Sequence, residues 1–190
     1  FIEMNPRIQV EHTITEVVTG IDLVQAQILV AEGYRLDSDE INIKSQADIK
    51  PRGYAIQCRI TTEDPSNHFA PDTGTITDYM TGSGFGIRLD GGNGFTGSVI
   101  TPYYDSLLVK ISAYGRTFDD TINKAIRALD ELRIKGVKTN VPYVMNVLNH
   151  DSFRKGICDT GFINDHPELM NIKVVADSEQ QILRFLIYMS

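Results

Sequence analysis

Five polar residues at the start of the chain alternate with apolar ones, and their types suit a metal ion and an anion. They are Glu3, Asn5, Arg7, Gln9 and Glu11. In an extended segment, alternate side chains lie on the same face. Carboxylate and amide oxygens are ligands for Mg²⁺, and a guanidinium binds a small planar anion through two parallel hydrogen bonds. A solvated strand face would show the same spacing, so the spacing alone leaves both interpretations open.

Glu11 and Arg59 suggest more specific chemistry. Glu11 lies at the entry to a predicted helix, where its carboxylate could take a proton from a neighbouring anion. Arg59 shares one face of a second alternating segment with Ala55 and Gln57. A single arginine in a strand is usually solvated or ion-paired, so this pattern does not by itself make Arg59 a functional residue.

The composition excludes two classes of partner. The chain has 25 acidic and 18 basic residues, a net charge of −7, which argues against non-specific binding to nucleic acid. No apolar run approaches the roughly 20 residues that a membrane-spanning helix needs. The first residues also lack the basic and apolar regions of a signal peptide. We therefore expect a cytoplasmic protein, and because the polar pattern begins at residue 1, we expect the chain to begin within a domain.

The cysteines and histidines form no recognisable ligand motif. Two cysteines, Cys58 and Cys158, are too few for a disulfide scaffold and fit a reducing compartment. The histidines are scattered singly and are expected to be surface or capping residues: His12, His68, His150 and His166. The sequence therefore predicts no zinc site.

Local patterns predict an α+β protein. The predicted strands, including two short pieces in a region rich in turn residues, are Ile2–Asn5, Tyr54–Thr61, Gly74–Tyr79, Phe85–Asp90 and Leu107–Tyr114. The predicted helices are Thr13–Gly20, Leu23–Glu32 with Asp22 as its cap, Phe118–Ile134, Asn140–Leu148, Asp151–Lys155 and Ser178–Met189. Tyr34–Arg52 is polar and irregular, and Asn171–Asp177 is typical of a linker.

Two apparent motifs are better explained as structural. Gly92–Gly97 matches the G-x-G-x-x-G pattern of dinucleotide sites, but that motif requires a helix immediately afterwards. The following residues, Ser98–Pro102, cannot open a helix there, so a glycine-rich turn is the better interpretation. Tyr103–Ser106 contains a serine and an aspartate without a nearby histidine, and we interpret it as support for the strand that follows.

Several long motifs resemble biotin carboxylases. FIEMNPRIQVEHTITEVVTG (Phe1–Gly20) resembles the closing strand and helix of their ATP-grasp domain. YAIQCRITTEDP (Tyr54–Pro65) and GFGIRLDGGNGFTGSVITPYYDSLLVK (Gly84–Lys110) resemble their carboxy-terminal domain, and the match continues in order through GVKTNVPYV (Gly136–Val144). The resemblance implies an α+β fold in which the end of an ATP-grasp domain precedes an antiparallel sheet with packed helices.

The same resemblance implies three segments. Residues 1–33 would be the end of the ATP-grasp domain, and residues 34–170 the carboxy-terminal domain. Residues 171–190 would begin a connector to a further domain. The glycine-rich lid and the phosphate-binding lysines of the family would lie upstream of Phe1, so we expect this chain alone to be inactive.

The family's metal and bicarbonate ligands match intact positions in this chain. Glu3 and Asn5 match the ligands of the Mg²⁺ or Mn²⁺ ions on the ATP phosphates. Arg7 matches the bicarbonate-binding arginine, and Gln9 with the backbone of Val10 would complete that site.

The family's proton-transfer and biotin-binding residues also have counterparts. Glu11 matches the carboxylate that takes the bicarbonate proton, and Arg59 matches the arginine that stabilises the biotin enolate. Arg7, Glu11 and Arg59 are therefore the expected catalytic residues. The implied reaction is the carboxylation of protein-bound biotin by bicarbonate, driven by ATP.

Within the family, three motifs are most similar to the pyruvate-carboxylating branch: ITTEDP, DGGNGF and FINDHPEL (Phe162–Leu169). That branch implies a biotinyl carrier domain and a carboxyltransferase domain in the same polypeptide. Phe85 and Arg88 resemble a region where such domains pair, which implies a homo-oligomer. Two alternatives remain: the biotin carboxylase component of an acetyl-CoA or propionyl-CoA carboxylase, and a non-catalytic dimerisation module.

Overall fold

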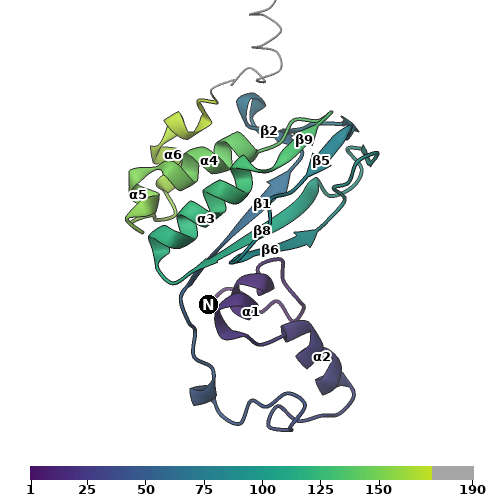
Figure 1. Cartoon of the computed structure of the whole chain (residues 1–190), viewed down its shortest axis with the longest axis vertical. Coiled ribbons are helices and arrows are strands. Elements are labelled where there is room, and N and C mark those ends of the chain that lie inside the picture. Colours follow the sequence, from purple (N-terminus) through teal and green to yellow (C-terminus); the bar gives the residue numbers. More distant parts are fainter. Residues whose placement is uncertain (173–190) are drawn as a thin grey trace, which may run out of the picture.

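A three-stranded antiparallel sheet is the centre of the structure, a computed structural model that describes residues 1–172 (Figure 1). Its strands are β1 (Tyr54–Thr61), β8 (Leu107–Gly115) and β6 (Ile87–Gly91), in the order β1-β8-β6. Helix α3 (Phe118–Asp130) packs across β8 and β1. The predicted α+β class is confirmed, and both long strands lie where the sequence pattern placed them.

The two faces of the sheet have different chemistry. Cys58 and Ile60 of β1 and Ile111 of β8 point into the core beneath α3, where Ile122 and Leu129 are also buried. The opposite face is polar next to α1, since successive side chains alternate along a strand. Register pairs Gln57 with Ser112 and Arg59 with Lys110 on that face. Helix α1 contacts both strands there. Further along that face, Leu108 of β8 is buried in a smaller apolar cluster with Ile76 and Ile100.

The remaining elements surround this sheet. Short strands form three pairs: β2 (Glu63–Asp64) with β3 (Ala70–Pro71), β4 (Gly74–Thr75) with β7 (Val99–Ile100), and β5 (Asp78–Met80) with β9 (Arg133–Lys135). Between α3 and residue 172 the chain also forms α4 (Val141–Asn149), α5 (Asp151–Arg154), α6 (Phe162–Asp165) and η3 (Pro167–Met170). The glycine-rich turn leads into β7, as expected, and not into a helix. A short 3₁₀ turn, η2, spans Pro65–Asn67.

The predicted helix at Phe118–Ile134 is too long at its end. Thr117 caps the helix by accepting a hydrogen bond from the Asp120 N–H, as the sequence pattern favours, but α3 ends at Asp130. Residues 133–135 then pair with β5 as strand β9. Leu132 and Ile134 continue the apolar spacing because they still pack on the core. Apolar spacing alone could not separate these two conformations.

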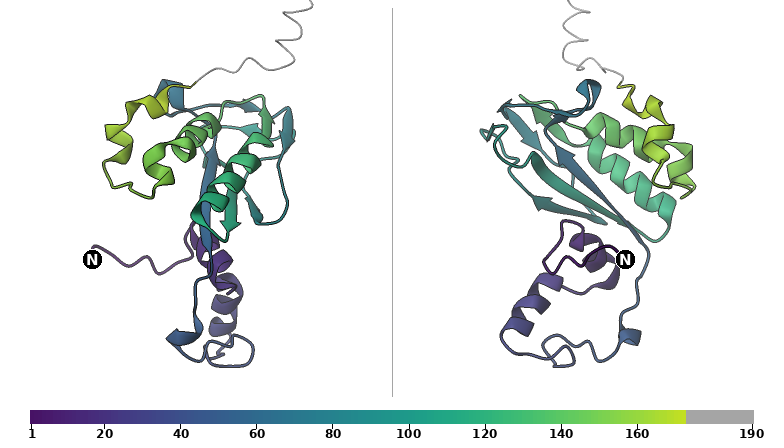
Figure 2. Two further views of the ribbon diagram at one scale, coloured as in Figure 1. Left: turned by 60° about the vertical axis from the view of Figure 1, so that its left-hand side comes forward. Right: turned by 180° about the vertical axis from the view of Figure 1, so that it is seen from behind.

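Two helices precede the sheet. Helix α1 (His12–Thr19) ends at Gly20, whose φ of 73° is in the left-handed region that favours glycine. Helix α2 (Leu23–Ala31) begins at Asp22, whose side chain accepts a hydrogen bond from the Gln25 N–H. Both confirm the predicted helices. Helix α2 and the irregular segment 34–52, with one short 3₁₀ turn at Gln46–Asp48 (η1), extend away from the sheet (Figure 2).

No single helix in residues 1–172 is long and apolar enough to cross a membrane. Helices α1 and α2 meet the length and composition criterion only as a pair, across a bend of 100°.

The predicted strand at Ile2–Asn5 is absent. Residues 1–4 are exposed, and the N-terminal stretch projects away from the rest of the molecule (Figure 2). A strand needs a neighbour to pair its backbone groups, and no described segment pairs with this stretch. The expected helix at Ser178–Met189, and all but the first two residues of the expected linker, lie outside the described residues.

Candidate functional site

Glu11 and Arg59 meet at the polar face of the sheet. Arg59 Nη2, from β1, lies 3.0 Å from Glu11 Oε2 at the start of α1. Both side chains are about half exposed, at 50% and 56%, so solvent screens the pair and it adds little to stability. Its importance is geometric, because it brings together two predicted site residues separated by 48 positions.

Gln57 connects the same two segments and was not singled out as a site residue from the sequence. Its Nε2 donates to the Val10 carbonyl at 3.0 Å and to Thr13 Oγ1 at 2.5 Å. Its Oε1 accepts a hydrogen bond from Arg59 Nε at 3.3 Å. One amide therefore holds the Arg59 guanidinium and the backbone of Val10 in a fixed relation. The signal in the sequence was its position on the same strand face as Arg59.

Lys110 and Ser112 extend this arrangement to the central strand. Lys110 Nζ donates to the Val10 carbonyl at 3.4 Å and lies opposite Arg59 in the register. Ser112 Oγ is 3.0 Å from Thr13 Oγ1, and both residues are fully buried. The Val10 carbonyl is thus bound by two side chains, from β1 and β8. This arrangement fixes residues 10–13 on the sheet.

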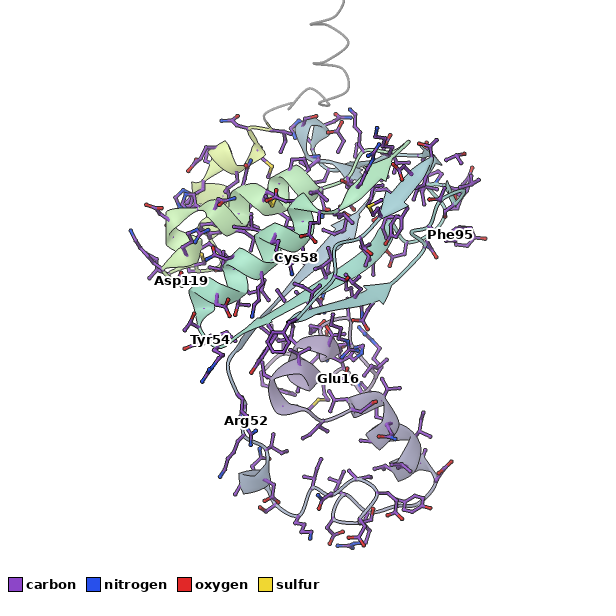
Figure 3. All side chains as sticks on the ribbon, in the orientation of Figure 1. Glu16, Arg52, Tyr54, Cys58, Phe95 and Asp119 are labelled. Atoms are coloured by element: carbon purple, nitrogen blue, oxygen red, sulfur yellow. The ribbon has the colours of Figure 1, made fainter. Side chains whose placement is uncertain are left out.

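Glu16 and Arg88 join α1 to the edge strand β6. Glu16 is 8% exposed, and its Oε2 lies 2.6 Å from Arg88 Nη1. The other oxygen accepts a hydrogen bond from the Leu23 N–H at 2.8 Å. Figure 3 shows Glu16 where α1 meets the sheet. Hydrogen bonds from Arg88 to Asp90, and then to Glu16, raise the pKa of the Arg88 guanidinium.

A groove of about 630 Å³ begins next to the Glu11–Arg59 pair. Arg7, Gln9 and Glu11 line one part of it. His12 and Thr15 of α1 and mostly apolar side chains of α2 and the segment after it line the rest. Within this groove His12 Nδ1 lies 2.6 Å from the Gln9 carbonyl oxygen. Three predicted bicarbonate and proton-transfer residues therefore face one open space.

The structure does not bring the predicted metal ligands to this site. Glu3 is exposed, and among the described residues its side chain makes no hydrogen bond or ion pair. Asn5 is partly exposed and contributes a backbone carbonyl to the Arg7 N–H. The structure thus assembles Val10, Glu11 and Arg59, but leaves Glu3 and Asn5 on the projecting N-terminal stretch.

The two cysteines are not part of this site. Cys58 is 4% exposed beneath α3, and burial raises the pKa of its thiol to about 12 (Figure 3). A thiol in this state is inert at neutral pH because the thiolate is the reactive form. Cys158 is exposed, and both thiols are free.

Comparisons with known proteins identify the family of the chain. Residues 57–165 match the family model of the biotin carboxylase C-terminal domain, and residues 1–39 match that of the carbamoyl-phosphate synthase L chain ATP-binding domain. Pyruvate carboxylase of Bacillus subtilis is 55% identical over 186 residues, and that of Schizosaccharomyces pombe is 54% identical. These alignments cover 98% of this chain but only 16% and 15% of those relatives.

Solved structures show the same likeness. The complete multifunctional pyruvate carboxylase of Rhizobium etli has a TM-score of 0.86 and 50% identity, covering 90% of this chain and 16% of that one. The biotin carboxylase domain of a thermophilic 2-oxoglutarate carboxylase, solved with bicarbonate, has a TM-score of 0.84 and 43% identity. That match covers 90% of this chain and 37% of the other.

Proposed function

We propose that this chain, which belongs to the biotin carboxylase C-terminal domain family, supplies part of the active site of a pyruvate carboxylase. The reaction is the carboxylation of protein-bound biotin by bicarbonate, driven by ATP. The observation that carries the proposal is the contact of Glu11 with Arg59, because it unites the expected proton acceptor with the expected biotin-binding cation. In this proposal, residues 1–33 end the ATP-grasp domain, residues 34–170 form the carboxy-terminal domain, and residues 171–190 begin a connector.

Arg7, Gln9 and the backbone of Val10 bind bicarbonate in this proposal. The guanidinium of Arg7 suits a planar anion because it offers two parallel donors. Gln9 lines the same groove, and Val10 is held in place by Gln57 and Lys110. Bicarbonate would therefore be bound between the guanidinium of Arg7 and the backbone of Val10.

Glu11 and Arg59 carry the proton and charge steps. Glu11 is half exposed at the groove, so its carboxylate can take the proton of bicarbonate. Arg59 supplies a guanidinium that can stabilise negative charge that develops on the biotin ureido oxygen. Their mutual contact keeps both groups in place before the substrates arrive.

Glu3 and Asn5 would hold the metal that accompanies ATP. A carboxylate and an amide offer the hard oxygen ligands that Mg²⁺ or Mn²⁺ prefers, so the donor set fits. ATP with its metal supplies the phosphoryl group that activates bicarbonate, and biotin supplies the nitrogen that accepts the carboxyl group. Because the chain spans about 16% of its curated relatives, the rest of the ATP site comes from residues outside it.

Pyruvate is the proposed acceptor. This choice is supported by the curated pyruvate carboxylases of Bacillus subtilis and Schizosaccharomyces pombe, which are 55% and 54% identical over 98% of this chain. The partners would be the biotinyl carrier and carboxyltransferase domains of the same cytoplasmic polypeptide. A second copy would pair near Phe85, which is 88% exposed, and near Arg88.

Transfer of radiolabelled bicarbonate by the complete polypeptide tests this function. With ATP and Mg²⁺ we expect label on the biotinyl domain and then on pyruvate, with little on 2-oxoglutarate or acetyl-CoA. Glu11→Gln should lower the first transfer by about 100-fold or more, since general base catalysis contributes 10² to 10⁴. Label that stays on biotin and does not reach pyruvate would refute pyruvate as the acceptor. The absence of label on biotin would refute biotin carboxylation as the reaction.

A further inference from the structure

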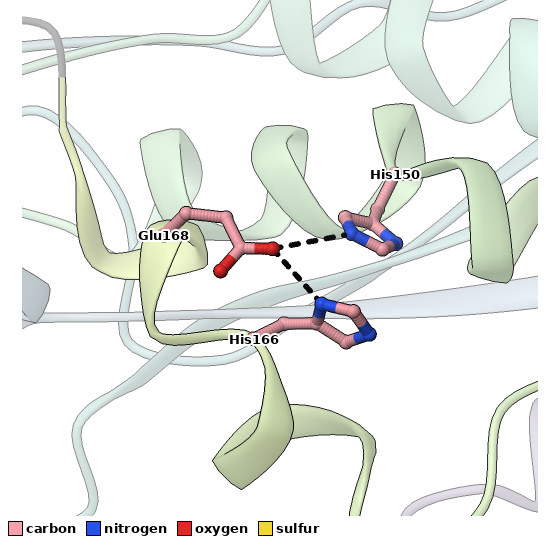
Figure 4. Close-up of side chains that lie close together, drawn as sticks. All are labelled: His150, His166 and Glu168. Atoms are coloured by element: carbon pink, nitrogen blue, oxygen red, sulfur yellow. Dashed lines mark hydrogen bonds and ion pairs between the residues drawn. The ribbon is translucent and has the colours of Figure 1, made fainter.

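His150, His166 and Glu168 form a cluster that the proposed reaction does not use. The sequence predicted single surface or capping histidines, and His150 does cap α5. Its ring nevertheless lies 4.2 Å by centroid from the ring of His166. His166 Nδ1 is 2.9 Å and His150 Nε2 is 3.5 Å from the same Glu168 oxygen (Figure 4). The chain separates His150 from the other two by α5 and α6, which concealed the cluster from a search for sequence motifs.

We propose that His150, His166 and Glu168 bind a divalent transition-metal ion such as Zn²⁺. Two imidazole nitrogens and one carboxylate oxygen are a ligand set that zinc uses in proteins, with a fourth position open to water. The three donor atoms all lie within 4.8 Å of one another. Tetrahedral ligands at the usual zinc distances are roughly 3.3 Å apart, which is close to the 2.9 and 3.5 Å separations already present.

The surroundings favour a fixed site. Phe162, which is 8% exposed, packs its ring against both imidazoles, with centroids 5.2 Å from His150 and 5.1 Å from His166. Leu169 is buried beside Glu168, and its carbonyl accepts a hydrogen bond from Asn146 of α4. An apolar support of this kind limits the motion of the ligands and the access of water.

Two existing hydrogen bonds must change when the metal binds. The bond between His166 Nδ1 and Glu168 gives way to coordination of both atoms, because a nitrogen that binds a metal carries no proton. The Ser152 N–H donates to His150 Nδ1 at 3.2 Å, which places the ring proton on Nε2. A metal on Nε2 requires that nitrogen to be free, so the proton moves to Nδ1 and this long helix cap is lost. The metal would replace it with a link between the start of α5 and the segment at η3. Metal binding would therefore attach residues 166–170 more tightly to α5.

Metal titration of the full chain tests the site. We expect one equivalent of Zn²⁺ to bind in competition with a chromophoric chelator, and a higher melting temperature for the metal-bound form. His166→Ala and Glu168→Gln should each weaken binding by about 100-fold or more, since loss of even an outer-shell partner costs 10- to 100-fold. His68→Asn is the matched control, because His68 is exposed and asparagine tolerates its positive φ of 50°. Equal affinity in His166→Ala and the parent chain would overturn the proposal.

The spectrum of bound Co²⁺ provides a readout in the unaltered chain. Nitrogen and oxygen ligands give d–d bands without sulfur-to-metal charge transfer, and we expect that spectrum at one equivalent. A thiolate charge-transfer band would instead show that the exposed Cys158 binds the ion, and this result would contradict the proposed ligands. Neither measurement depends on carboxylase activity, so the outcome is independent of the proposed function.

Discussion

Gln57 joins the two parts of the candidate site through the two ends of one amide. Its nitrogen holds Val10 and Thr13, and its oxygen accepts from Arg59. Spacing along the chain could not reveal this, because Val10 and Gln57 are 47 residues apart. The motif resemblance identified Arg59 and Glu11 as site residues, but it supplied no reason for the residue two positions before Arg59. The structure supplies the reason, since both side chains share the polar face of β1.

Two substitutions of Gln57 separate its contacts in the complete polypeptide. Gln57→Ala removes every contact, and we expect kcat for biotin carboxylation to fall by roughly tenfold or more, as is usual when a supporting residue is lost. Gln57→Glu keeps an acceptor for Arg59 but cannot donate to Val10. Compared with Gln57→Ala, it should therefore recover the dependence of the rate on biotin concentration but still show a raised KM for bicarbonate. The measurement is steady-state kinetics with each substrate varied. Identical kinetics for both variants would contradict separate roles for the two ends of the amide.

At the scale of elements, the long strands and the start of α3 were predictable because their patterns are local. Residues 54–61 alternate between the two faces of the sheet, residues 107–115 form an apolar and largely buried strand, and Thr117 is a strong helix cap. The end of α3 was not predictable, because β9 depends on pairing with a strand more than 50 residues earlier. The prediction of a strand at residues 2–5 was wrong because local alternation does not supply a pairing partner, and no described strand lies beside this segment.

The attachment of α1 to β6 depends on a buried acid. Arg88→Met should loosen α1 strongly, because it leaves the Glu16 carboxylate, which is 8% exposed, without its cation. Breaking a buried ion pair in this way costs about 3–5 kcal/mol; the cost here should be smaller because Arg88 is itself 37% exposed. Glu16→Gln should cost less, because the remaining arginine can still reach Asp90 and solvent.

Hydrogen exchange of the α1 amides measures this attachment. We expect faster exchange at residues 13–19 in Arg88→Met than in Glu16→Gln, with unchanged exchange in β8. Arg127→Met on α3 is a suitable control, since its partner Glu131 is 45% exposed and can be solvated without cost. Equal exchange of α1 in all three variants would show that the apolar contacts of α1 alone hold it on the sheet.

At the scale of the whole molecule, the proposed function divides the complete site between this chain and other residues of a longer polypeptide. The ATP-binding family model matches only residues 1–39, and the N-terminal stretch that carries Glu3 and Asn5 projects from the rest of the molecule (Figure 2). The carboxy-terminal domain is different, because its sheet, α3 and the Glu11–Arg59 contact are assembled within the chain itself. We therefore expect that nucleotide binding can be lost while the part of the site around Arg59, which would bind biotin, stays folded.

The isolated 190-residue chain provides that separation. We expect it to fold, with a cooperative unfolding transition for the β1-β8-β6 sheet and α3, because its main core is continuous. We also expect no bicarbonate-dependent ATP hydrolysis above the rate without protein, because a single segment of an ATP-grasp domain cannot enclose the phosphates. Calorimetry measures the unfolding transition, and phosphate release with ATP and Mg²⁺ measures the hydrolysis. The complete polypeptide is the positive control. ATP turnover by the isolated chain would mean that residues 1–39 and the groove beside Glu11 suffice for nucleotide binding, and the division of the site proposed here would be wrong.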